Sequence, residues 1–400
     1  MGWVTEHHPT TEELNACVQC GLCLPVCPTF RLTGRETASP RGRLHAMSAV
    51  AEGVVEVDET FTSIIDFCLG CRACEPVCPG LVPYGRALEG TRAEIAAQVP
   101  GRQSQRSWSV GKALGSRVTM RAAGLGLLVA QALGLTALAP LRYRRVARGL
   151  RRLRGRGRPS LGREFGPPDS DRIVGLLAGC IQDEWFRPVN RAALELLEMA
   201  GHRVVVPTNQ TCCGALAAHD GKAEAAKAYA TSNFDAFGGC DVVVATAAGC
   251  SAHLAGYEWP GFVSATMDIT VTVARDIEAG LLPTLDGSRG KIAIQDPCHL
   301  RHAQRVIAEP RLILEAAGYE VVEIDDVGLC CGAAGLYTVL QPEASEQLGI
   351  RKADQVRSSG AKMVASANPG CEMQLRSYLR GEVDIRHPIE WYLKAVMEGR

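Results

Sequence analysis

The sequence has few aromatic residues and no excess of charge of either sign. Aromatic residues make up 5% of the 400 residues, and 43 Lys and Arg offset 43 Asp and Glu, so the formal net charge is zero. A balanced chain has no overall attraction for polyanions, and we therefore expect no nucleic-acid partner.

Nucleotide-binding and hydrolase motifs are also missing. The chain has no G-x-G-x-x-G loop after a strand, no Walker A loop and no G-x-S-x-G elbow. We therefore expect no flavin or nicotinamide in this chain, and we assign no catalytic residue to it.

No apolar signal segment stands in the polar N-terminal residues 1–14. Disulfides persist in oxidising compartments, to which such a segment would direct a protein. The 17 cysteines are therefore expected to be thiols in the reducing cytoplasm.

Cysteine is abundant. The motif C-x2-C-x2-C-x3-C-P occurs twice, beginning at Cys17 and again at Cys68. This run is typical of proteins with two 4Fe-4S clusters, in which the fourth cysteine of each run ligates the other cluster. Zinc sites commonly pair two C-x2-C units and need no third cysteine at this spacing. The predicted ligand sets are Cys17, Cys20, Cys23 and Cys78 for one cluster, and Cys68, Cys71, Cys74 and Cys27 for the other.

Residues 1–95 are predicted to form a helical, ferredoxin-like domain around these clusters. Ser39 followed by Pro40 is an N-cap signal, and Asp58 can cap a second helix. Arg41 and Arg43 lie at the start of the first of these helices. We expect both side chains in solvent rather than facing a cluster.

Residues 96–170 are predicted to be a helical and basic linker segment. Residues 122–141 contain no charged side chain and reach the length of a membrane span, but they are rich in Ala and Gly. We expect a helix that is buried or faces a partner, with docking on a membrane surface as the alternative and no span. Residues 142–163 carry ten arginines, which predict an interdomain linker that can also contact anionic lipid headgroups.

The remaining chain is an internal repeat, with units at residues 171–285 and 286–400. The same offset separates Cys180 from Cys298 and Cys212 from Cys330. In each unit, buried strand-like runs alternate with helical runs, which predicts parallel sheets. The predicted fold class is thus α+β and multidomain, with a helical domain followed by two α/β units.

Each repeat places cysteines just after the predicted strands, where open α/β sheets bind ligands. We expect the two sets to meet at one shared cleft, as a further iron-sulfur cluster or a thiol redox site. Cys240 lies outside the repeated pattern and is expected to serve packing. The candidate residues of this site are Cys180, Cys212, Cys213, Cys250, Cys298, Cys330, Cys331 and Cys371.

Histidines accompany these cysteines. His253, His299 and His302 are close enough in sequence to tune or ligate a cluster, but hydrogen-bonded loop histidines are the commoner case. His7 and His8 are expected in solvent.

With these motifs in place, the chain resembles the iron-sulfur subunit of bacterial glycolate oxidase, also called glycolate dehydrogenase, over nearly its whole length. The resemblance rests on both cysteine runs, Ser39-Pro40-Arg41-Gly42-Arg43, Cys212-Cys213-Gly214, Leu329-Cys330-Cys331-Gly332 and Asn368-Pro369-Gly370-Cys371. It implies a non-catalytic electron carrier that works beside flavin-containing dehydrogenase subunits oxidising glycolate to glyoxylate. Electrons would pass to quinone or another membrane acceptor, which implies a peripheral place at the inner face of the cell membrane.

The same motifs leave other functions open. Relatives with this cysteine repeat serve lactate or glycerol 3-phosphate oxidation, and heterodisulfide reductases use five thiolates for each cluster. Here His253 and Gln374 stand where a fifth cysteine would follow Cys250 and Cys371. The alternatives are therefore an electron-transfer subunit for lactate or glycerol 3-phosphate, a thiol-disulfide redox protein, or a metal-stabilised scaffold.

Overall fold

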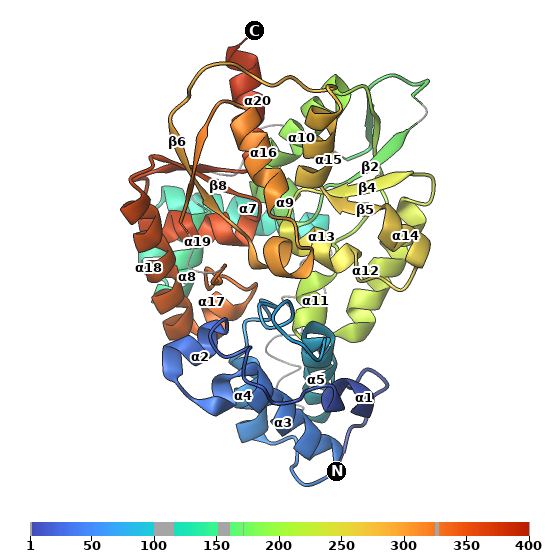
Figure 1. Ribbon diagram of the computed structural model, residues 1–400, viewed down its shortest axis with the longest axis vertical. Helices are drawn as coiled ribbons and strands as arrows, with labels where there is room; N and C mark the ends of the chain where they lie inside the picture. The colour runs from blue at the N-terminus through green and yellow to red at the C-terminus, as the bar shows by residue number, and fades with distance from the viewer. Residues whose placement is uncertain (1, 100–115, 151–160, 171, 325–327, 400) are drawn as a thin grey trace.

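The computed structural model describes residues 2–99, 116–150, 161–170, 172–324 and 328–399. Figure 1 shows the helical N-terminal domain at one end of the molecule and two sheets side by side at the other. The predicted fold class is confirmed, because helices come first and two α/β units follow.

The N-terminal domain contains only helices and loops among its described residues. Ser39 Oγ accepts a hydrogen bond from Gly42 N at 3.0 Å, and Asp58 Oδ1 accepts one from Phe61 N at 2.7 Å. Both predicted caps are thus confirmed. The helices are α1 (Thr11–Asn15), α2 (Pro28–Thr33), η1 (Glu36–Ala38), α3 (Pro40–Ala51), α4 (Glu59–Asp66) and α5 (Tyr84–Gln98).

The first repeat forms a sheet with the strand order β1-β3-β2-β4-β5. Strands β2 to β5 are parallel, as predicted, but β1 pairs antiparallel with β3. The strands are β1 (Arg163–Phe165), β2 (Ile173–Leu177), β3 (Arg203–Val206), β4 (Val242–Ala245) and β5 (Thr266–Asp268). The helices are α9 (Ile181–Trp185), α10 (Arg187–Met199), α11 (Ala215–His219), α12 (Ala223–Ala236), α13 (Ala248–Leu254), α14 (Pro260–Ala265) and α15 (Ile269–Glu278).

The second repeat forms a fully parallel sheet with the order β7-β6-β8-β9. Its central strands have the same order as β3-β2-β4 of the first repeat. The strands are β6 (Lys291–Gln295), β7 (Glu320–Glu323), β8 (Met363–Ser366) and β9 (Asp384–Arg386). The helices are η4 (His299–Ala303), α16 (Ala308–Ala316), α17 (Tyr337–Leu340), α18 (Pro342–Ser359), α19 (Pro369–Leu379) and α20 (Pro388–Glu398).

One apolar core joins the two repeats. Val174 and Leu176 of β2 belong to the same buried cluster as Ile292 and Ile294 of β6. Helices α10, α15, α16 and α20 pack against one another between the sheets. The shared core fixes the orientation of the two cysteine-bearing edges.

The segment predicted as a linker contains ordered structure. It forms α7 (Arg117–Ala132), η3 (Leu135–Ala137), α8 (Leu141–Gly149) and β1. Helix α8 packs on α19, and Arg145 is buried, where it donates to the Pro342 carbonyl at 3.1 Å and pairs with Glu346. Residues 141–149 of the predicted helical and basic linker segment form a helix that packs on the second repeat. The rest of the arginine-rich stretch, residues 151–160, lies outside the described residues.

Within the part of the chain that the structure describes, no helix is both long and apolar enough to cross a membrane. Helix α7 has one face on the first repeat, through Met120 and Leu127. Its other face is exposed, with Leu125 and Val129 about half accessible. The helix is thus not buried within this chain.

Candidate metal centres

The first predicted cluster site is a small cavity whose lining includes Cys17, Cys20, Cys23 and Cys78, and also Cys74 of the second predicted set. The loop around it turns through positive φ angles at Gln19 and Gly21. Arg41 supports this turn, because its Nη1 donates to the Gln19 carbonyl at 3.2 Å while its Nε pairs with Glu36 at 2.6 Å. A Cβ on Gly21 would lie 2.9 Å from that Nη1 atom. Arg41 is thus partly exposed but faces the cluster loop, which corrects the sequence-based expectation.

The second predicted site is deeper, and Cys27, Cys68, Cys71 and Cys74 are all buried. Burial raises the pKa of the Cys71 and Cys74 thiols well above their usual value, and neighbouring thiolates raise it further. Burial also opposes ionisation of Cys68, but the guanidinium groups of Arg43 and Arg92 outweigh it and lower the pKa of that thiol. Within this buried site, Cys68 is therefore the cysteine whose thiolate form is favoured by its surroundings.

Hydrogen-bond donors surround the Cys68 sulfur. The Gly70 N–H lies 3.4 Å and the Tyr84 hydroxyl 3.6 Å from its Sγ. Cys27 Sγ lies 3.3 Å from Thr29 Oγ1, but that hydroxyl donates its proton to the Ala38 carbonyl at 2.7 Å, so the donors to sulfur are those around Cys68. Such donors stabilise negative charge on sulfur and tune cluster potentials.

Arg43 is completely buried, so the prediction that it lies in solvent is wrong. Its guanidinium donates to the carbonyls of Ala38 and Ile64, each at 2.9 Å, and to Thr29 Oγ1 at 3.2 Å. The pKa of Arg43 rises because the thiolate charge of Cys68 outweighs the loss of hydration. A buried cation needs such a partner, which explains why α3 points this side chain inward.

The donor set fits iron-sulfur ligation. All 17 cysteines are free thiols. Cys78 lines the cavity of the first run, and the charge of Cys27 acts on Cys71 and Cys74 of the second run as well as on Cys23 of its own. The exchange of the fourth cysteine between the runs stays a prediction from the doubled run.

The eight cysteines of the repeats form two groups of four. In the first repeat, Cys180 Sγ lies 3.4 Å from Cys212 Sγ, and Cys213 Sγ lies 3.2 Å from Cys250 Sγ. A hydrogen bond from the Cys180 thiol lowers the pKa of the Cys212 thiol. In the second repeat, hydrogen bonds from Cys330 and Cys371 lower the pKa of the Cys331 thiol in the same way. We call Cys180, Cys212, Cys213 and Cys250 the first thiol group. Cys298, Cys330, Cys331 and Cys371 are the second thiol group.

The two thiol groups are neighbours at the contact between the repeats. Ala248 N donates to the Ala367 carbonyl at 3.1 Å, and Gly249 N donates to Asn368 Oδ1 at 3.3 Å. These residues directly precede Cys250 and Cys371. The close thiol contacts run within each repeat, and the shared cleft stays a prediction.

The second thiol group adjoins the N-terminal domain. Leu69 and Cys71 share one apolar cluster with Leu329 and Cys330. The Tyr337 hydroxyl donates to the Phe67 carbonyl at 3.1 Å across the same contact. The buried N-terminal site that contains Cys71 is therefore in direct apolar contact with the second thiol group.

A histidine cluster lies where α5, α11, α13 and η4 meet. His219 Nδ1 lies 2.7 Å from Glu89 Oε1, and the His219 ring is 5.5 Å from His299 and 6.3 Å from His253. Desolvation lowers the pKa of His253 to about 4. The hydrogen bond from His219 and the nearby histidines outweigh desolvation and lower the pKa of Glu89 to about 2.

Sequence reasoning singled out two members of this cluster, His253 and His299, and missed its partners. His219 and Glu89 have no motif around them, and only the folded contact brings them together. Arg92 was also missed: it donates to the His219 carbonyl at 2.9 Å and to the Cys68 carbonyl at 2.7 Å. It thus ties the cluster domain to the first repeat.

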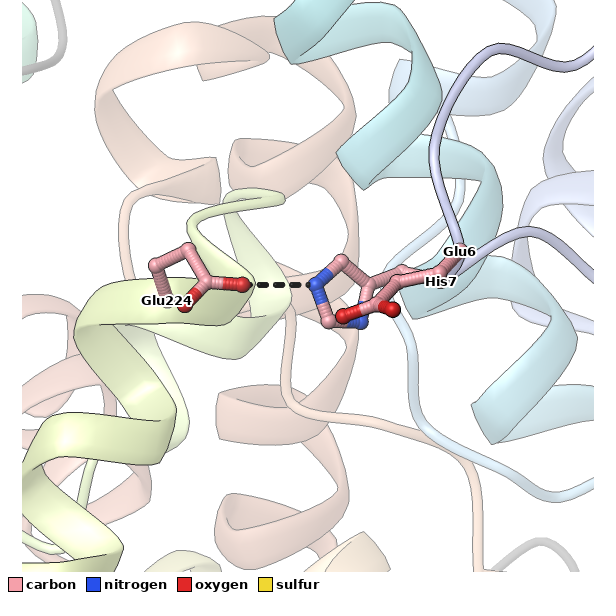
Figure 2. A group of neighbouring side chains, drawn as sticks. All are labelled: Glu6, His7 and Glu224. Atoms are coloured by element: carbon pink, nitrogen blue, oxygen red, sulfur yellow. Dashed lines mark hydrogen bonds and ion pairs between the residues drawn. The ribbon is translucent and has the colours of Figure 1, made fainter.

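The other histidines differ in their contacts. His302 Nε2 is hydrogen-bonded to the Gly328 carbonyl oxygen at 3.0 Å, as expected of a loop histidine. His7 was expected in solvent, but its Nε2 lies 3.0 Å from Glu224 Oε1 of α12. Figure 2 shows this pair bridging the N-terminal loop and α12, with the Glu6 carboxylate beside it. Cys240 packs at the edge of an apolar cluster, as expected, and burial raises its pKa to about 11.

Comparison with known proteins agrees with this arrangement. Residues 13–82 match the model of the 4Fe-4S dicluster domain, and residues 174–255 and 292–376 match that of the cysteine-rich domain. The class is therefore an iron-sulfur protein that joins a dicluster domain to a duplicated cysteine-rich domain.

Full-length relatives define the family more closely. The chain is 34% identical to the probable glycolate oxidase iron-sulfur subunit of Bacillus subtilis, over 96% of this chain and 94% of the relative. It is 30% identical to the glycolate oxidase iron-sulfur subunit of Escherichia coli, over 94% and 93%. The lactate utilization protein A of Macrococcus caseolyticus is 31% identical over 54% of this chain. The chain belongs to the family of glycolate oxidase iron-sulfur subunits.

Proposed function

We propose that this chain is the electron-transfer subunit of a flavin-dependent glycolate oxidase. The observation that carries the proposal is the apolar contact between the second buried N-terminal site and the second thiol group. It supports a chain of redox centres rather than isolated metal sites. The full-length relatives named above support glycolate as the substrate of the partner subunits.

We assign the two N-terminal clusters to the ligand sets predicted from the doubled run. A 4Fe-4S cluster accepts and releases one electron at a time, which suits relay from a two-electron flavin. The residues of this chain would hold and tune the clusters. Arg43 and Arg92 place positive charge beside Cys68, and Tyr84 and Gly70 donate toward its sulfur. The apolar cover formed by Leu329 and Tyr337 excludes water from Cys71.

We further propose that the second thiol group binds a third cluster. Four thiols converge there, as in each N-terminal site, and the pKa of the Cys298 thiol is lowered by a proton from Cys330. The rival function is thiol-disulfide exchange, which the close thiol pairs of both groups would allow. Iron content separates the two, since three clusters require about twelve irons per chain and two require about eight.

The remaining parts of the assignment concern partners and place. Flavin-containing subunits would donate the electrons, and quinone or another membrane acceptor would receive them at the inner face of the cell membrane. For domain boundaries we retain residues 1–95, 96–170, 171–285 and 286–400, with α8 packed on the last unit.

The test is reconstitution. The isolated chain should not oxidise glycolate, whereas adding the flavoprotein subunits should restore glycolate-dependent reduction of a quinone or dye. Cys71→Ser should abolish acceptor reduction and leave flavin reduction by glycolate intact. Glycolate turnover by the flavin-free chain would overturn the proposal, and turnover only with lactate-oxidising partners would replace the substrate.

A further inference from the structure

Exposed apolar side chains gather on one short segment of the molecule. Among the described residues, nineteen large hydrophobic side chains are exposed, and nine of them lie between residues 118 and 143. Leu133 and Leu138 are 68% and 84% exposed. We call the following residues the α7–α8 apolar surface: Leu125, Leu128, Val129, Leu133, Leu135, Leu138 and Leu141.

The spacing on α7 shows that this exposure is organised. Leu125, Leu128 and Val129 recur at three- and four-residue steps, which places them with Leu133 on one side of the helix. The opposite side carries Met120 and is already packed on the first repeat. From Ala122 to Ala132, α7 contains no charged residue, so the face that is not packed on the first repeat is one that water solvates poorly.

The charged residues of the segment itself have one sign. No Asp or Glu occurs between Glu94 and Glu164. Arg121, Arg142 and Arg144 lie along α7 and α8, and the Arg142 guanidinium is 5.1 Å from the centre of the Tyr143 ring. Acidic residues of neighbouring elements lie behind the segment, where Asp183 and Glu184 share a pocket with Arg121, and Glu346 pairs with Arg145. Exposed leucines on a segment whose own charges are all positive match an anionic bilayer surface.

The same helix borders the first thiol group. Met120 and Arg121 of α7 line a small pocket together with Cys180 and Cys212. The first thiol group therefore lies behind the helix that carries the apolar surface. Docking through this surface would bring that group closest to a lipophilic acceptor.

We propose that the α7–α8 apolar surface docks this chain in the plane of a bilayer that contains anionic phospholipid. The proposal rests on the assigned role as donor to a membrane acceptor and names the surface that serves it. The leucines enter the region between headgroups and acyl chains, to a depth of roughly 5–10 Å. The flanking arginines contact the phosphates.

The experiment measures binding of the cluster-loaded chain to vesicles by sedimentation. One set is phosphatidylcholine alone, and the other contains phosphatidylcholine with phosphatidylglycerol. The protein should bind the anionic vesicles more tightly. Leu133→Gln with Leu138→Gln should weaken that binding at least about tenfold, because each leucine loses its apolar environment.

The matched control changes two exposed hydrophobic side chains elsewhere, Val54→Gln with Leu281→Gln, which are 75% and 50% exposed. It should bind as the unchanged protein does. Arg142→Gln with Arg144→Gln should remove most of the preference for phosphatidylglycerol. The visible absorbance of the clusters reports that each variant is folded.

Three results would overturn the proposal. The unchanged protein could bind both vesicle types with equal affinity, or the control variant could lose as much vesicle affinity as the leucine variant. In the third result, the unchanged protein binds neither vesicle type, and the leucine variant no longer binds the flavoprotein subunits. The last result would assign the surface to a protein partner. Reduction of a water-soluble dye with the flavoprotein subunits should stay unchanged in the leucine variant. If that reaction fails in the unchanged protein, the proposed function fails while vesicle binding still tests the surface.

Discussion

The two thiol groups have the same cysteine pattern and different surroundings. The second group touches Leu69 and Cys71 of the N-terminal domain. The first group has a pocket beside it, walled by Met120 of α7. Duplication thus preserved the four thiols, while their neighbours differ: the N-terminal domain packs beside the second group, and α7 borders the first.

The immediate supports of the two groups differ as well. In the first, Tyr257 donates to the Cys213 carbonyl at 2.7 Å, and Asn233 Nδ2 donates to the Cys212 carbonyl at 3.0 Å. In the second, Ser345 donates to the Gly332 carbonyl at 2.8 Å, and the Lys352 charge helps to lower the pKa of the Cys331 thiol, after the hydrogen bonds from Cys330 and Cys371. A nearby cation favours a more negatively charged centre in the second group.

The largest expected difference is between equivalent cysteine variants. Cys330→Ser should remove about four irons per chain and stop acceptor reduction, while the N-terminal clusters still accept electrons from the flavoprotein. Cys212→Ser should leave the reduction of the second thiol group's cluster intact. Iron analysis and electron paramagnetic resonance after single-turnover reduction measure both effects. Identical losses in the two variants would show that the groups act as one site.

The crossed ligands give the next test, because they decide whether Cys27 or Cys78 completes the cluster at Cys71, which adjoins the second repeat. Cys27→Ser should alter the cluster held by Cys68 and Cys71, although it belongs to the other run in sequence. Cys23→Ser, the matched control, should alter the first cluster. The paramagnetic spectra of the two reduced clusters distinguish these outcomes. If Cys27→Ser perturbed only the first cluster, each run would ligate its own cluster and the crossed ligand sets would be wrong.

A smaller effect is expected from the buried cation beside that cluster. Removing the charge in Arg43→Met should lower the reduction potential of the cluster at Cys68 by on the order of 100 mV, because an added electron loses a close positive charge. Arg41→Met, at the first cluster, should leave this potential nearly unchanged. Potentiometric titration monitored by paramagnetic resonance reads both. An unshifted potential in Arg43→Met would mean that the charge is compensated by its carbonyl partners.

The comparison also shows what the sequence could predict. The cysteine spacing predicted a dicluster domain, which the family match to residues 13–82 supports, and the alternation of apolar runs located six parallel strands, because these features are local or periodic. Arg43 was misplaced because arginine at a helix start is usually solvated, and its inward direction depends on carbonyls from two other segments. The antiparallel strand β1 was missed because its pairing with β3 is a non-local contact and its sequence is charged.

The relation between the repeats and the rest of the chain was equally beyond local reasoning. Nothing in the sequence around Glu89 or His219 indicates a shared site, since the residues are distant and have no motif. The same holds for Tyr337, whose hydroxyl bonds the Phe67 carbonyl across the domain contact. Equal spacing predicted equal thiol groups, but it could not predict which group the N-terminal domain covers.

The smallest expected effect concerns equivalent helix caps at the ends of the two repeats. Asp268 caps α15 in the first repeat, where its side chain accepts from Thr270 N, and His387 caps α20 in the second, where Nδ1 accepts from Ile389 N at 3.3 Å. Burial lowers the pKa of His387 to about 3, from an ordinary value of about 6.5. The folded state therefore binds fewer protons than the unfolded chain between these values, so this stabilising contribution is complete above about pH 6.5 and declines as the pH falls toward 3.

Between pH 7 and pH 5 the loss should be roughly 2 kcal/mol, measured as the free energy of unfolding in urea from helical circular dichroism. His387→Asn retains a cap acceptor without a titrating group, so its unfolding free energy should change less over this interval. Asp268→Asn in the first repeat is the matched control. Burial raises the pKa of Asp268, which opposes the pH dependence from His387, so this variant should have a slope at least as steep as that of the unchanged protein between pH 7 and pH 5. If the unfolding free energy of His387→Asn fell with pH as steeply as that of the unchanged protein, this account would be wrong. The pH dependence would then come from titratable groups other than His387.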